Sequence, residues 1–106
     1  MRAVILAAFL VAGCQAQPEA AAIIATHCGA CHTVPGVAGA NGRVGPSLAG
    51  VGRQQILAGH FPNNRTNMVR WITHAQTMLP GDAMPDTDLT PAEAQAVADY
   101  LYTLDR

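Results

Sequence analysis

Lysine is absent from this 106-residue sequence, and charged residues of all kinds make up only 12% of it. The six basic residues are arginines scattered along the chain, and with seven acidic residues they give a formal net charge of −1. Nucleic-acid binding needs positive charge concentrated on one face. The composition therefore indicates that nucleic acid is not a partner.

Long apolar runs are also missing. Residues 3–12, which follow Arg2, form an apolar run well short of the roughly 20 residues that a membrane-spanning helix needs. A short apolar run behind a basic residue is typical of a secretory signal, so residues 1–13 are predicted to be a signal peptide. Residues 10–14 resemble the lipobox of bacterial lipoproteins, which predicts cleavage before Cys14 and lipid attachment to it.

Cysteine is scarce and odd in number. Of the three cysteines, Cys28 and Cys31 belong to one motif, and Cys14 is left over. Lipidation accounts for the remaining thiol, and the alternative is an ordinary cleaved signal in which Cys14 is incidental. With a lipid, residues 14–17 become a short tether that holds the exported domain on the periplasmic side of a bacterial membrane.

The motif is Cys28-Gly29-Ala30-Cys31-His32. Two thiols three positions apart in a helical turn lie on one side, within reach of the two vinyl groups of a haem edge, and the adjacent histidine can bind the iron. A structural zinc site needs four nitrogen or sulfur ligands, and no second cluster is present. A thioredoxin-like dithiol would follow a strand, and no strand pattern precedes it. One covalently attached haem c is predicted.

Helices are predicted over residues 18–28, near 53–58 and over 66–76, with a Gly-rich loop over 33–45. A last helix begins at Thr90-Pro91-Ala92-Glu93, which reads as a capping box with proline in the first turn. No repeat or second domain is evident. Residues 18–106 are too few to build a large hydrophobic core, so a buried macrocycle would supply part of it.

Two further positions are expected beside the haem. Residues 78–85 hold two prolines and a glycine and are predicted to form a rigid loop. A methionine on such a loop suits the iron face opposite His32, with Met84 preferred and Met78 the alternative. Pro46 is expected to leave its carbonyl free to accept a hydrogen bond from His32 Nδ1, which would set the tautomer of the ring.

In their order and spacing these motifs resemble those of class I cytochromes c. The resemblance is carried by Cys28-x-x-Cys31-His32-Thr33-Val34, Gly45-Pro46-x-Leu48, Gly52-Arg53, Trp71, Met84-Pro85 and Tyr100-Leu101. Residues 53–86 are most similar to the cytochrome domain fused to subunit II of bacterial haem-copper oxidases. The resemblance implies an all-α fold of a few helices around the haem, with Arg53, Asn63 and Trp71 as partners of its propionates.

The expected function is electron transfer in a bacterial respiratory chain, without enzymatic activity, because His32 and Met84 would fill both axial positions of the iron. Expected partners are redox proteins such as a terminal oxidase or a dehydrogenase, approached by a membrane-tethered monomer. One alternative is a fixed haem subunit of a dehydrogenase or reductase complex. A second is a haem-based ligand sensor, which requires Met84 to be absent from the iron or labile.

Overall fold

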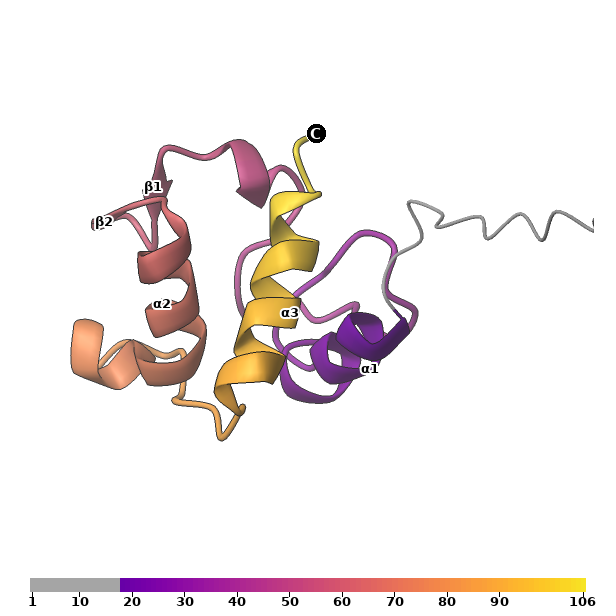
Figure 1. Cartoon of the computed structure of the whole chain (residues 1–106), viewed down its shortest axis with the longest axis horizontal. Coiled ribbons are helices and arrows are strands. Elements are labelled where there is room, and N and C mark those ends of the chain that lie inside the picture. The colour runs from indigo at the N-terminus through magenta and orange to yellow at the C-terminus, as the bar shows by residue number, and fades with distance from the viewer. Residues whose placement is uncertain (1–17) are drawn as a thin grey trace, which may run out of the picture.

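The computed structural model describes residues 18–106, in which helices α1 and α2 pack against α3 and a small hairpin lies at the edge (Figure 1). The predicted signal peptide and the tether with Cys14 lie outside these residues. The elements in chain order are α1 (Pro18–His27), the 3-10 helix η1 (Val51–Arg53), β1 (Ile56–Leu57), β2 (Phe61–Pro62), α2 (Arg65–Met78) and α3 (Pro91–Tyr102). The predicted all-α fold of a few helices is confirmed, with one short hairpin added. None of the described helices has the length and apolar character to cross a membrane.

Helix α3 is the centre of the arrangement, with α1 and α2 both packed against it (Figure 1). Ala20 and Ile24 of α1 are fully buried, as are Ala94, Val97 and Ala98 of α3. Small side chains at a helix crossing let two helices approach closely, and Ile24 supplies the apolar volume beside them. These residues form part of one continuous core.

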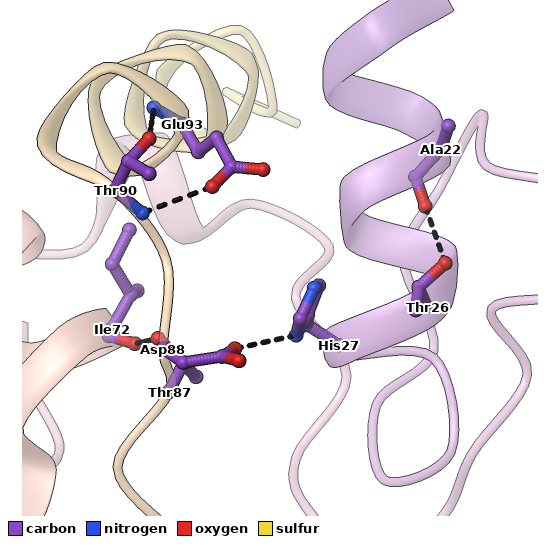
Figure 2. A network of polar contacts seen from close by, with 8 residues as sticks. All are labelled: Ala22, Thr26, His27, Ile72, Thr87, Asp88, Thr90 and Glu93. Atoms are coloured by element: carbon purple, nitrogen blue, oxygen red, sulfur yellow. Dashed lines mark hydrogen bonds and ion pairs between the residues drawn. The ribbon is translucent and has the colours of Figure 1, made fainter.

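The capping box predicted at the start of α3 is present (Figure 2). The Glu93 backbone N–H donates to Thr90 Oγ1 over 3.2 Å, and the Thr90 N–H donates to Glu93 Oε1 over 3.0 Å. In the segment just before, Asp88 faces His27 at the end of α1, with 3.8 Å between Oδ1 and Nδ1. Asp88 is almost fully exposed, so this contact adds little to stability.

The helix predicted near residues 53–58 is wrong. The chain there leaves η1 and forms the antiparallel hairpin β1–β2, in which Leu57 pairs with Phe61. Ala58 and Gly59 have positive φ values of 52° and 72°, which a right-handed helix excludes and a tight turn uses. A segment of six residues is also too short to nucleate a helix without tertiary support.

Helix α2 is longer than predicted and is bent near its end. The Asn64 side chain caps its start by accepting from the Asn67 backbone N–H over 2.8 Å. His74 departs from helical geometry, with φ −132° and ψ 47°. The helix continues to Met78, so the predicted non-helical loop is correct only from Leu79 onward.

Candidate functional site

A cavity of about 410 Å³ lies within the described fold. Its walls come from the segment after α1, the loop at 46–48, the β1 hairpin, α2, the loop after α2, and α3. The volume is in the range of small-molecule and cofactor sites. Five of the predicted site residues line it, namely Cys28, His32, Pro46, Trp71 and Met84.

The His32 ring is held by a backbone acceptor. Its Nδ1–H donates to the Pro46 carbonyl oxygen across 2.7 Å. A carbonyl only accepts hydrogen bonds, so Nδ1 carries the proton and Nε2 keeps its lone pair. The bond therefore leaves the imidazole in the tautomer that binds a metal through Nε2, as predicted for Pro46.

Gly45 lies against the same ring. Its N–H donates to the Cys31 carbonyl over 2.7 Å, and a Cβ added to it would sit 2.5 Å from His32 Cε1. Only glycine fits this approach without displacing the imidazole. Sequence reasoning included Gly45 in a motif but assigned it no role, because the contact depends on how the loop folds back on His32.

The two cysteines of the motif lie on one tight turn. The N–H groups of Cys31 and His32 both donate to the Cys28 carbonyl, over 3.2 and 2.9 Å. Both cysteines are free thiols. Cys28 lines the cavity, and burial raises the pKa of its thiol, with a smaller rise from neighbouring Cys31. Cys31 is partly buried beside the cavity rather than in its lining.

Two methionines line the cavity. Met84 reaches it from the loop after α2 and is partly exposed, whereas Met68 reaches it from α2 and is 1% exposed. Met78 is not among the lining residues. The geometry therefore favours Met84 over Met78, and it adds the buried Met68, for which the sequence predicted no role at the site.

The three residues implied as propionate partners are placed differently. Trp71 lines the cavity, with its ring centroid 5.9 Å from that of Phe61. Arg53 is exposed at the end of η1, and neither it nor Asn63 belongs to the cavity lining.

The amide of Asn63 is engaged elsewhere. Its nitrogen donates to the carbonyls of Val51 and Gln54, over 3.0 and 2.7 Å, and its oxygen accepts from the Tyr102 hydroxyl over 2.7 Å. Two donors and one acceptor site are thus in use. Asn63 thus connects Val51 and Gln54, which line the cavity, to Tyr102 at the end of α3.

A zinc site finds no support in the described part of the chain. Within residues 18–106, no group of three or more His, Cys, Asp or Glu side chains is placed to hold a metal ion. A structural zinc needs four such ligands.

Comparison with known proteins agrees with this geometry. The family model described as cytochrome c matches residues 18–105. Cytochrome c2 iso-2 of Magnetospirillum molischianum is 38% identical over 92 residues, which cover 74% of this chain and 92% of that protein.

Two further relatives are much longer proteins. Cytochrome c oxidase subunit 2 of Alkalihalophilus pseudofirmus is 32% identical over 78 residues, covering 73% of this chain and 22% of the relative. Cytochrome c oxidase subunit 2 of Bacillus sp. (strain PS3) is 31% identical over 90 residues, covering 81% of this chain and 25% of the relative. The chain thus spans a quarter or less of these two relatives.

Proposed function

Since the chain belongs to the cytochrome c family, we propose that it is a monohaem electron carrier with His32 and Met84 as axial ligands. The observation that carries the proposal is that Met84, from a distant part of the sequence, lines the same cavity as Cys28 and His32 of the motif. The bound haem would supply a one-electron iron couple.

The residues present fit one covalently attached haem c. Cys28 and Cys31 are free thiols on one turn, and each S–H can add across one vinyl group without an oxidant. His32 offers Nε2, because Nδ1 is committed to Pro46. Apolar side chains supply walls for a flat macrocycle: Leu48, Val51, Leu57, Ile72 and Leu101. Trp71, which lines the same cavity, is the remaining candidate for a propionate contact.

A methionine ligand opposite the histidine separates a carrier from an enzyme or a sensor. If His32 and Met84 both held the iron, no coordination site would remain for a substrate or a gas. Thioether sulfur also favours the reduced state and so raises the potential. These residues support an electron carrier without catalytic activity of its own.

We further propose that the protein is exported and anchored by a lipid on Cys14, on the periplasmic side of a bacterial membrane. Helix α1 begins at Pro18, and the three residues between it and Cys14 reach at most about 10 Å. In the two oxidase relatives the matching region is part of a larger subunit. A lipid on a short tether would replace that connection, and a monomer could then exchange electrons with a terminal oxidase or a dehydrogenase of a respiratory chain.

The oxidase relatives also favour a second candidate, a haem subunit held permanently in a larger redox complex. Purification in mild detergent distinguishes the two. A carrier separates as a single chain, whereas a fixed subunit co-purifies with its partners in constant proportion.

The test of the carrier is the absorption spectrum of the purified holoprotein, oxidised and reduced, before and after carbon monoxide. The wild type is expected to show a c-type spectrum that the gas does not change. Met84→Ala is expected to bind carbon monoxide, and Met78→Ala, outside the cavity lining, is the matched control. Gas binding by the wild type would favour a sensor, and gas binding by Met68→Leu alone would assign the ligand to Met68.

A further inference from the structure

Residues 79–89, which we call the Met84 loop, are hydrogen-bonded to the bend in α2. In a regular helix the carbonyls of Ile72 and Thr73 would accept from N–H groups four residues later. Here the Thr87 hydroxyl donates to the Ile72 carbonyl over 2.8 Å, as Figure 2 shows, and the Thr87 N–H donates to the Thr73 carbonyl over 3.2 Å. The departure of His74 from helical angles accompanies this exchange of partners.

A backbone amide just after the bend is also paired with the loop. The Gln76 N–H donates to Asp86 Oδ1 over 2.9 Å, so a carboxylate from the loop caps the last turn of α2. Helix and loop therefore complete each other's hydrogen bonds on the carboxyl-terminal side of Met84.

The Gln76 side chain holds the other side of the loop. Its Nε2 donates to the carbonyls of Asp82 and Met84, over 2.6 and 2.8 Å. Its Oε1 accepts from the Gly81 N–H over 3.2 Å. One side chain thus bonds three backbone groups of residues 81–84, including the carbonyl of the methionine itself. Among residues 18–106, the one other hydrogen bond to the Met84 backbone comes from within the loop, where its N–H donates to Asp82 Oδ2 over 3.2 Å.

We propose that Gln76 is a positioning residue for the Met84 sulfur, and that it determines how firmly the thioether is held at the distal side of the haem. The inference rests on the proposed function, in which Met84 is the distal ligand. Residues 79–89 contain no helix or strand, so their backbone groups depend on side-chain partners for their positions. Gln76 is part of α2, which packs against α3. Its side-chain amide therefore connects the Met84 loop to the core.

The chemistry requires glutamine. Two carbonyls need N–H donors and one N–H needs an acceptor, and a primary amide offers both. Glutamate has the same shape but no N–H donor. Gln76→Glu therefore keeps the side-chain volume and places a negatively charged acceptor beside the Asp82 and Met84 carbonyls, which are acceptors themselves. Gln76→Ala removes all three bonds.

The experiment uses ferric holoprotein and imidazole as the competing ligand. Both variants are expected to bind imidazole at least roughly tenfold more tightly than the wild type, because the hydrogen bonds to the Asp82 and Met84 carbonyls no longer hold the loop closed. The charge-transfer band of ferric iron bonded to thioether sulfur should weaken, and the reduction potential should fall. Gln95→Ala is the matched control, since that side chain accepts from Arg65 on the surface of α3.

A second control separates positioning from general loss of stability. Asn63→Ala removes three hydrogen bonds to Val51, Gln54 and Tyr102, none of which belongs to the Met84 loop. If the Gln76 variants change imidazole affinity, band and potential no more than Asn63→Ala does, the inference is overturned. If Met84→Ala matches the wild type in all three, the proposed ligation itself fails, whatever the Gln76 variants show.

Discussion

The Tyr102 hydroxyl donates a hydrogen bond to the side-chain oxygen of Asn63 across 2.7 Å, which ties the end of α3 to the residue just after the hairpin. On its other side the Asn63 amide holds the carbonyls of Val51 and Gln54. The two residues thereby connect the end of α3 to Val51 and Gln54, which line the cavity. The strength of this connection can be tested from either partner.

Replacing Asn63 with alanine is expected to lower the free energy of unfolding by about 2 to 3 kcal/mol, because three hydrogen bonds are lost and partly buried groups are left unpaired. Denaturant unfolding of the holoprotein measures the change. Asn41→Ala, at an exposed loop position, serves as control and should stay within about 0.5 kcal/mol of the wild type. An unchanged midpoint in Asn63→Ala would show that the amide does not support the wall.

Stability should fall at alkaline pH through Tyr102. Burial raises the pKa of this phenol, and the positive charge of Arg65 lowers it by a smaller amount. The fold therefore favours the neutral hydroxyl, so its contribution is complete below the ordinary tyrosine pKa of about 10 and is lost as pH rises through the higher folded value. Unfolding curves over this range should decline less steeply for Tyr102→Phe. Parallel declines in the two proteins would contradict this assignment.

Gly45→Ala is expected to destabilise the holoprotein by about 1 to 3 kcal/mol, because the added methyl group would overlap the His32 ring. The free energy of unfolding measures the effect. A Cβ at Gly39 meets open space, although its φ of 83° is unfavourable for alanine, so Gly39→Ala should cost no more than about 1 to 2 kcal/mol. Equal effects of the two substitutions on unfolding and on the spectrum would mean that the imidazole can move aside without penalty.

Cys14→Ser should release the protein from the membrane fraction, because the proposed lipid is the only anchor expected from the sequence. Fractionation of cells that express the wild type or the variant, with haem absorption as the marker, measures this. A Cys14→Ser protein that still sediments with membranes would show that something other than a lipid on this residue holds it there.

Short-range patterns made part of the site predictable. The Cys28-x-x-Cys31-His32 spacing, the Thr90–Glu93 capping box and the helix-breaking residues before Met84 act within a few positions of one another. Their geometry follows from one helical turn or one proline ring, so it can be read without knowing the rest of the fold.

Where residues distant in sequence meet, the sequence was not enough. Residues 53–58, expected to form a helix, lead into a hairpin. Asn63, expected at the haem, bonds Tyr102 and does not line the cavity, and Gln76 bonds the carbonyl of Met84. Local preference in a short segment amounts to a few tenths of a kcal/mol per residue, and tertiary hydrogen bonds and packing exceed it. By itself the sequence determined the family of the chain and the residues proposed to bind the haem. Only the tertiary structure decided what holds those residues in place, because the supporting contacts join parts of the chain that no local pattern relates.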